Sequence, residues 1–176
     1  MADHLLALAS GIDARPVAPR EAAKSIGKEV TFPADIESVE EVERVLLDLA
    51  EKVGYRLRRK GCKGRTIQLK LRLGDFRTYT RSRTLAEATC YDRDIYETAL
   101  ALYRALGVHQ GIRLLGIAIS GFDTSGAISL FHEEVRKENL YAAIDSIKKR
   151  FGEQGITKAH LLKREPADDG DKEDEV

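Results

Sequence analysis

The stretch RTIQLKLRL, residues 65–73, alternates strictly between polar and apolar side chains from Thr66 onward. A two-residue period places successive side chains on opposite faces of a β-strand. We therefore predict a strand with one apolar face, which must be buried beneath a second layer of secondary structure. Its apolar face comprises Ile67, Leu69, Leu71 and Leu73, and its polar face comprises Thr66, Gln68, Lys70 and Arg72.

The residues before this strand predict another strand and a helix. Residues 24–32 (KSIGKEVTF) alternate imperfectly, and we expect Pro33 to end the strand that they form. In residues 38–59, Ser38 and Glu41 have the spacing of a helical capping box. Apolar side chains then recur at helical spacing and predict one buried stripe, made of Val39, Val42, Leu46, Leu49 and Val53.

The residues after this strand predict a hairpin. Gly74 and Asp75 separate two strand-like runs, so we expect a two-residue turn into a second strand over residues 76–85. On that strand, one face carries Arg77, Tyr79, Arg81 and Arg83, and we expect some of these arginines to share the uncovered face of the sheet with Lys70 and Arg72.

Three further elements follow. Asp92 is a candidate cap for a helix that ends at Gly107, and residues 111–122 are apolar on both faces, as in a central strand. Residues 138–152 predict a last amphipathic helix, with a buried stripe of Leu140, Ile144, Ile147 and Phe151. The order β-α-β-β-α-β plus a C-terminal helix predicts an α+β fold, in which two helices cover one face of a four-stranded sheet.

Positive charge is concentrated in one part of the chain. Residues 56–84 hold eleven Lys or Arg and one acid, Asp75, although the whole chain is neutral, with 29 basic and 29 acidic residues. A solvated strand face explains one or two such charges, whereas this concentration favours a phosphate backbone as partner, because bound cations release its counterions. The pattern does not separate DNA from RNA, although the aromatic signature of one common RNA-binding module is missing.

Three segments carry a family resemblance: GIDARPVAPREAAKSIGKEVTF, RTIQLKLRLGDFRTYTRSRTL and IRLLGIAISGF. In this order, with helices between them, they resemble the C-terminal part of Y-family translesion DNA polymerases of the bacterial DNA polymerase IV type, over about residues 5–162. The resemblance implies that residues 1–23 are the end of the thumb and a linker. It further implies a little-finger DNA-binding domain over residues 24–122, and a clamp-peptide-like segment with the C-terminal helix over residues 123–162.

The resemblance also implies which residues face DNA. In the family, polar and basic side chains of the segments that match KSIG, TRSRT and IRLLG do so. Carried over to this chain, they are Lys24, Ser25, Gly27, Arg81, Ser82, Arg83, Thr84 and Arg113. Strand parity adds Arg72 and Arg77 to these candidates.

The segment AISLF, residues 127–131, stands where many relatives carry a Gln-Leu-Ser/Asp-Leu-Phe peptide that inserts into a sliding clamp. Three residues match that pattern and Ile128 is a conservative change, whereas Ala127 lacks the Gln amide; the matches are Ser129, Leu130 and Phe131. Two interpretations stay open: a clamp-binding peptide, or an ordinary apolar segment that docks the last helix.

The chemistry of synthesis is expected to lie elsewhere. Such polymerases hold two metal ions with the acids of a palm domain, and no segment of this chain resembles a palm. We expect no catalytic, metal-binding or cofactor-binding residue here, whereas the parent polymerase would use Mg²⁺. Gly27-Lys28 is not a phosphate-binding P-loop, because Ala22 stands where that motif requires Gly. The histidines and cysteines show no ligand spacing.

The expected function is therefore that of a DNA-gripping module of an error-prone polymerase, present here as a non-catalytic C-terminal fragment. The alternative is a stand-alone, non-catalytic adaptor that binds DNA or a clamp. Residues 163–176, rich in acids, predict a disordered tail. No apolar run approaches the roughly 20 residues that span a bilayer, so we expect no membrane partner and a bacterial cytoplasmic, nucleoid-associated location.

Overall fold

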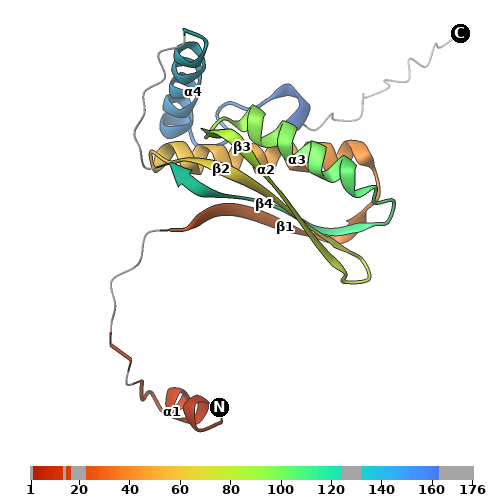
Figure 1. Ribbon diagram of the computed structural model, residues 1–176, viewed down its shortest axis with the longest axis vertical. Helices are drawn as coiled ribbons and strands as arrows, with labels where there is room; N and C mark the ends of the chain where they lie inside the picture. Colours follow the sequence, from red (N-terminus) through yellow and green to blue (C-terminus); the bar gives the residue numbers. More distant parts are fainter. Residues whose placement is uncertain (1, 14, 17–22, 124–131, 163–176) are drawn as a thin grey trace, which may run out of the picture.

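A four-stranded antiparallel sheet with the strand order β1-β4-β2-β3 forms the centre of the protein. The computed structural model describes residues 2–13, 15–16, 23–123 and 132–162. The strands are β1 (Ser25–Ile36), β2 (Lys63–Leu73), β3 (Thr78–Thr89) and β4 (Ile112–Asp123). Helices α2 (Val39–Arg59) and α3 (Asp92–Leu106) lie together on one face of the sheet (Figure 1). The predicted α+β fold and its element order are confirmed.

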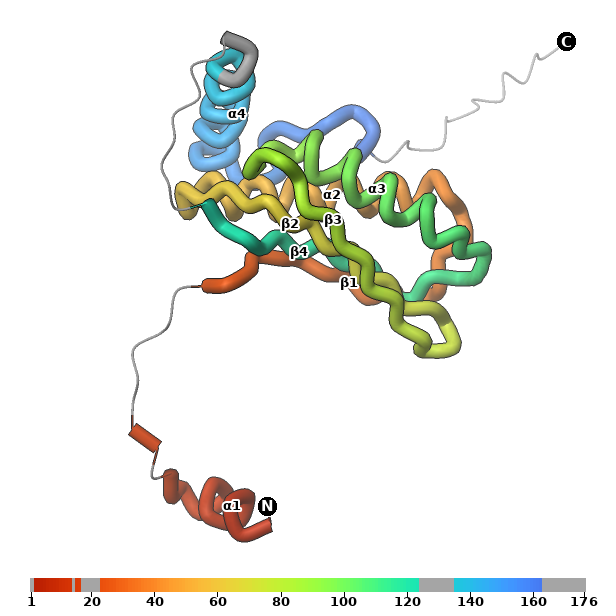
Figure 2. Tube along the Cα trace, viewed as in Figure 1, coloured from red at the N-terminus to blue at the C-terminus, as the bar shows by residue number. Residues whose placement is uncertain are grey.

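Two further helices are described beyond this core. Helix α1 (Ala2–Ala9) precedes it, and α4 (His132–Phe151) follows β4, with a short 3-10 turn at Ala159–Leu161. The trace in Figure 2 shows α4 standing at the end of the sheet where α2 finishes. None of the helices in the described ranges is long and apolar enough to cross a membrane.

The core lies between the sheet and the two covering helices. The apolar face of β2 behaves as predicted, because Ile67, Leu69 and Leu71 are all fully buried. Burying such a side chain stabilises a protein by about 1.5–3 kcal/mol. Strand β4 pairs with both β1 and β2, so its predicted central position is also confirmed.

Strand β1 does not end at Pro33 as the sequence predicts. The strand continues to Ile36, with an irregularity in its pairing to β4 between Thr31 and Ile36. Because β1 is an edge strand, a residue without an N–H can sit there without removing a ladder hydrogen bond from a central strand. The proline therefore marks the irregular stretch and not the end of the strand.

The predicted helix starts are correct in position and partly wrong in detail. Ser38 caps α2, since its Oγ accepts a hydrogen bond from the backbone N of Glu41 at 3.3 Å. The same hydroxyl donates to Glu40 Oε2 at 2.7 Å, and Val39 is half exposed instead of buried. Asp92 does not cap α3, because Tyr91 occupies the cap position and the Asp92 carboxylate is buried against Arg58.

Helix α4 contacts the core through a polar face. Its predicted apolar stripe is wrong, because Leu140 and Phe151 are largely exposed. Instead, Tyr141 is buried and stacks on Tyr91 with ring centroids 5.1 Å apart, and Asp145 accepts a hydrogen bond from Arg58 Nε at 2.8 Å. The Arg58 guanidinium between α2 and α4 thus makes the contact that the sequence pattern predicts for an apolar stripe.

The turn between β2 and β3 contains three residues and not the two that were predicted. Leu73 N donates to Arg77 O at 2.9 Å, and Phe76 N donates to Leu73 O at 3.0 Å. Gly74, Asp75 and Phe76 therefore form the loop, and Phe76 has a positive φ of 67°.

Candidate nucleic-acid interface

The face of the sheet that α2 and α3 leave open carries mainly small and hydroxyl side chains. Residues directly opposite each other in an antiparallel register share a face, so the pairing assigns every strand position to one side. Gln68 and Lys70 of β2 face away from the buried leucines, so their partners on the neighbouring strands also lie on the open face. Continued across the sheet, the register adds to this face Thr66 and Arg72 of β2, Ser25, Gly27, Glu29 and Thr31 of β1, Leu114, Gly116, Ala118 and Ser120 of β4, and Thr78, Thr80, Ser82 and Thr84 of β3.

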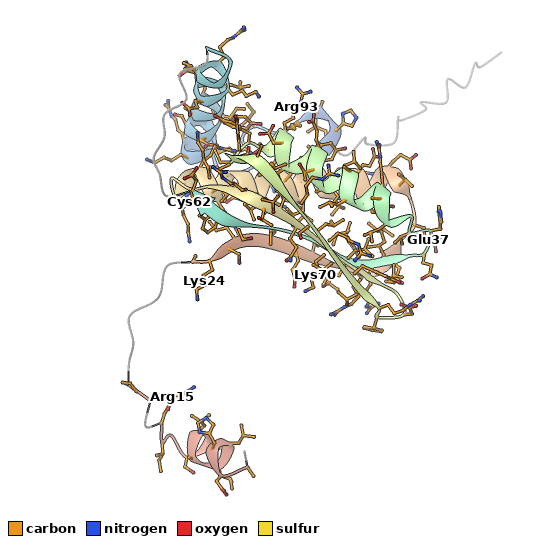
Figure 3. The ribbon with its side chains drawn as sticks, in the orientation of Figure 1. Arg15, Lys24, Glu37, Cys62, Lys70 and Arg93 are labelled. Atoms are coloured by element: carbon orange, nitrogen blue, oxygen red, sulfur yellow. The ribbon has the colours of Figure 1, made fainter. Side chains whose placement is uncertain are left out.

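The middle of the open face is nearly neutral. Lys70 Nζ lies 2.9 Å from Glu29 Oε2, and the two residues reach each other across Gly116, which pairs with both. A Cβ on Gly116 would lie 2.8 Å from the Cβ of Glu29, so only glycine leaves room for this contact. A shallow hollow of about 370 Å³ lies here, and Figure 3 shows Lys70 near the middle of the sheet.

Arg72 is the other cation on this face. Its Nε donates to Thr78 Oγ1 on the neighbouring strand at 2.9 Å. The guanidinium is therefore held against the sheet and keeps its remaining N–H donors for a ligand. Arg72 pairs with Thr78 and Leu114 on the open face, as strand parity predicts, and its contact with DNA stays a prediction.

Arg81 and Arg83 lie on the opposite side of the sheet from Lys70 and Arg72. They pair with Leu69 and Ile67, whose side chains point toward the helices. The expectation that some of the β3 arginines share the open face with Lys70 and Arg72 is therefore wrong for Arg81 and Arg83. They stay exposed because β3 is an edge strand, and their guanidinium groups project from the border of the sheet.

Ser82 and Thr84, which lie between and beyond these arginines, are on the open face. Both are exposed, and the Thr84 hydroxyl lies 3.0 Å from the Thr66 hydroxyl on β2. Strand β3 thus presents hydroxyls to the open face and guanidinium groups to the other side of the same edge.

Arg77 lies at the hairpin tip, before the first residue of β3. Its Nε donates to Asp75 Oδ2 at 2.6 Å, and its Nη2 donates to Gln110 Oε1 at 3.2 Å. A hydrogen bond from the backbone N of Arg77 helps hold the pKa of the Asp75 carboxyl below its usual value. Arg77 is therefore partly neutralised by its own turn.

Arg113 contacts the same tip from β4. Its guanidinium lies 5.1 Å from the centre of the Phe76 ring, and its Nη1 is 3.6 Å from Asp35 Oδ1. Arg77 and Arg113, two of the predicted cations, therefore lie at the same end of the sheet, which is opposite to the end where β2 begins at Lys63.

The remaining predicted residues lie at the start of β1, where the structure adds cations that the prediction missed. Lys24 immediately precedes the strand (Figure 3), and Arg56 Nη1 donates to the carbonyl of Gly27 at 3.1 Å. A hollow of about 490 Å³ is lined there by Ser25, Ile26, Gly27, Arg56, Arg59 and Lys60. Within the described residues, no carboxylate pairs with these last three cations. The i,i+4 spacing of Arg56 and Lys60 was the available signal, because it places them on one side of the helix end.

Two predictions concern other kinds of site. Ala127, Ile128, Ser129, Leu130 and Phe131 lie outside the described residues, so the clamp-peptide interpretation stays a prediction. The part of the chain that the structure describes contains no group of three or more His, Cys, Asp or Glu placed to hold a metal ion.

Comparison with known proteins identifies the family. The model of the impB/mucB/samB family C-terminal domain matches residues 23–130, which is more than half of the chain. The chain is 36% identical over 171 residues to a DNA polymerase IV of Clostridium kluyveri, covering 89% of this chain and 42% of that protein. It is 38% identical over 165 residues to a DNA polymerase IV of Desulfatibacillum aliphaticivorans, covering 90% of this chain and 42% of that protein.

One further relative and one solved structure were also found to be similar. A DNA polymerase IV of Caulobacter vibrioides is 38% identical over 159 residues, covering 89% of this chain and 40% of that protein. A structure described as a complex of a β-clamp processivity factor and the little finger domain of PolIV aligns with a TM-score of 0.49 and 22% identity, over 61% of this chain and 97% of that one. The chain spans about two fifths of the length of these curated relatives. This chain belongs to the impB/mucB/samB family, and residues 23–130 are the C-terminal domain of that family.

Proposed function

We propose that this domain grips the phosphate backbone of primer–template DNA for an error-prone polymerase that copies damaged templates. The observation that carries the proposal is the division of the sheet into a nearly neutral centre and two cationic borders. Small side chains and hydroxyls in the centre allow a duplex to approach closely, and hydroxyls and backbone N–H groups donate to phosphate oxygens.

The dimensions of the sheet suit a DNA groove. Three inter-strand steps of about 4.8 Å separate β1 from β3, which makes the sheet roughly 14 Å wide. The major groove of B-DNA is about 12 Å wide and admits a two-stranded β-ribbon, so a four-stranded sheet would lie across the groove and reach both of its edges. Cations at the two borders, Arg56 with Lys60 beside β1 and Arg81 with Arg83 on β3, would then lie near the two phosphate ridges.

Such binding is independent of base sequence. The Arg and Lys side chains at the borders neutralise phosphates of any sequence and release the counterions bound to them. The slope of log affinity against log salt concentration is then about −0.9 for each phosphate neutralised. The proposal implies that the whole polymerase uses Mg²⁺. It also implies the bacterial cytoplasm as the place of action.

A salt-dependent titration tests the proposal. Fluorescence anisotropy with a labelled primer–template duplex should show binding at low salt, a steep loss of affinity as salt rises, and the same affinity for duplexes of unrelated sequence. Failure to bind duplex at the lowest salt concentration, or an affinity that does not depend on salt, would contradict it.

We also propose that residues 127–131 contact a sliding clamp. The support is the match of Leu130 and Phe131 to the last two positions of the clamp-binding peptide. Calorimetric titration of a bacterial clamp with the wild-type chain should show binding, and changing both residues to Ala should remove it. A wild-type chain that does not bind a clamp would retire the idea.

A further inference from the structure

Phe76 occupies a backbone position at which glycine is usual. It is the third residue of the three-residue turn between β2 and β3, and its φ is 67°. Such turns place their last residue in the left-handed region, which glycine enters without steric cost. Within the described residues, Phe76 is the one residue other than glycine with a positive φ. A bulky side chain at this position is uncommon, and backbone strain of this kind gathers at functional sites.

The ring of Phe76 gains little from the fold. The residue is 65% exposed, so its apolar surface remains largely in water. Its one aromatic contact is with the Arg113 guanidinium, which lies 5.1 Å from the ring centre, within the range of a cation–π interaction. The turn therefore holds an aromatic ring outward at a cost in backbone strain that burial does not offset.

The turn that carries the ring is well fixed. The carbonyl of Phe76 accepts from Thr78 Oγ1 at 3.5 Å, and Asp75 Oδ1 accepts from the backbone N of Arg77 at 3.0 Å. Gly74 N also donates to the carbonyl of Gly111 at 3.1 Å, which ties the tip to the loop before β4. These bonds fix the backbone that carries the ring, so little backbone conformational entropy is lost when a ligand stacks on it.

The position of the tip suggests what the ring meets. Figure 1 shows the tip of the β2–β3 hairpin projecting beyond β1 and β4, away from α3, at one end of the sheet. The proposed duplex would lie along this sheet, so the ring stands at the margin of the duplex. Beside the ring are the guanidinium groups of Arg77 and Arg113, each partly neutralised by a carboxylate.

We propose that Phe76 stacks on an unpaired base of single-stranded DNA at the edge of the duplex held by the sheet. This inference rests on the proposed function. A nucleobase fits the site because it is flat and stacks on an aromatic ring, while its phosphates find the two guanidinium groups nearby. An apolar protein pocket fits less well, because seating the ring there would strip water from Arg77 and Arg113.

A tryptophan reporter tests the inference directly. The chain contains no Trp, so Phe76→Trp introduces a single tryptophan at the tip, whose fluorescence can be excited apart from that of the tyrosines. A duplex with a 5′ template overhang should quench this fluorophore, whereas a blunt duplex, and a duplex whose overhang lacks bases, should not. The matched control is Phe151→Trp on α4, because Phe151 is 66% exposed and has Arg150 5.2 Å from its ring.

A second variant keeps the test decisive if the tryptophan disturbs the turn. Phe76→Ala should weaken binding of the overhang substrate by roughly 5- to 150-fold, the loss expected for one stacked base, and should leave blunt-duplex affinity unchanged. Overhang binding without quenching, equal quenching by blunt duplex, or equal losses on both substrates would overturn the stacking and leave the proposed duplex grip standing. Absence of binding to any DNA would overturn both.

Discussion

Arg81 lies directly opposite the buried Leu69 in the register of β2 and β3, yet its own side chain is exposed. The two residues share a side of the sheet, but helices cover only the inner strand at this level. The cation therefore projects from the border of the sheet. The distribution of charge in this domain is set by which strand is at the edge, as well as by which face a residue occupies.

Replacing Arg81 and Arg83 with Ala should weaken binding to duplex DNA of any sequence. If each guanidinium neutralises one phosphate, the slope of log affinity against log salt should fall by roughly two. Anisotropy titrations over a range of salt concentrations measure that slope. The matched control replaces Arg93 and Arg104, two exposed arginines of α3 on the helix side, and should leave the slope unchanged. An equal effect of both double variants would assign the change to net charge alone.

Glu29→Gln should strengthen DNA binding. The Glu29 carboxylate lies 2.9 Å from Lys70 on the open face, where it both repels phosphate and competes for that cation. Because an exposed ion pair is weak, a gain of up to about fivefold in affinity is expected. Glu97→Gln, which removes an equal charge from an exposed pair on α3, is the control. Weaker binding by the Glu29 variant would show that the carboxylate positions Lys70 for DNA.

Arg58→Ala should destabilise the domain strongly. Burial opposes the charge on Arg58, but its hydrogen bond to Asp145, together with its interactions with Asp92, outweighs burial and raises its pKa. Removing the guanidinium leaves the Asp92 carboxylate buried without its ion pair to Arg58. Loss of one partner of a buried ion pair lowers the free energy of unfolding by about 3–5 kcal/mol in comparable sites. Urea denaturation measures the loss.

The exposed Arg93–Glu97 pair again provides a control, since Arg93→Ala should leave the urea midpoint unchanged within error.

Asp145→Ala should destabilise the protein more locally than Arg58→Ala. Hydrogen exchange should then rise in α4 while the sheet stays protected, because Asp145 joins that helix to Arg58. Uniform exchange through the whole domain would contradict this local role.

Phe76→Gly should give a more stable protein than Phe76→Ala. Both changes remove the ring, but only glycine accepts a φ of 67° without strain. The difference in free energy of unfolding should be about 1 kcal/mol, measured by urea denaturation. If alanine were the more stable variant, the backbone at this position would not be strained.

Stability should fall as the pH rises above 10. Burial, followed by the nearby Asp92 charge, raises the pKa of Tyr141 from 10.0 to about 12. Because the folded state holds this proton more tightly than the unfolded state, the contribution to stability is complete below pH 10 and is lost as the pH rises toward 12. Denaturation midpoints across this range measure the fall.

The matched variant for that prediction is Tyr141→Phe, which keeps the ring that stacks on Tyr91 and removes the ionising hydroxyl. Its stability should depend less on pH in this range. Burial also raises the pKa of Tyr96 and Tyr103, so a smaller dependence should remain in the variant. An identical pH profile in wild type and variant would exclude Tyr141 as the source.

Local pattern predicted the fold because each main element carries its own signal. The alternation of Ile67, Leu69 and Leu71 marked the buried face of β2, and the Ser38 cap marked the start of α2. The face of α4 could not be predicted, because Arg58 is distant in sequence from Asp145 and replaces an apolar contact by an ion pair. Spacing on one helix carries no information about a partner on another.

The candidate interface was predicted in composition but not in arrangement. Residue type marked Arg81 and Arg83 as cations on a strand, whereas their place outside the helix layer depends on β3 being an edge strand. The contribution of Arg56 depends likewise on the packing that brings the end of α2 to the carbonyl of Gly27. Both facts follow from sheet order, which alternation within single strands does not encode.

The open borders of the sheet have a consequence for solubility. A strand without a neighbour exposes backbone groups that can pair with a second copy of the same chain, and proteins commonly prevent this with charge or proline. Pro33 on β1, and Arg81 and Arg83 on β3, occupy such positions here. Stripping the guanidinium groups from β3 should therefore promote edge-to-edge aggregation of the protein, which light scattering would detect before any loss of secondary structure.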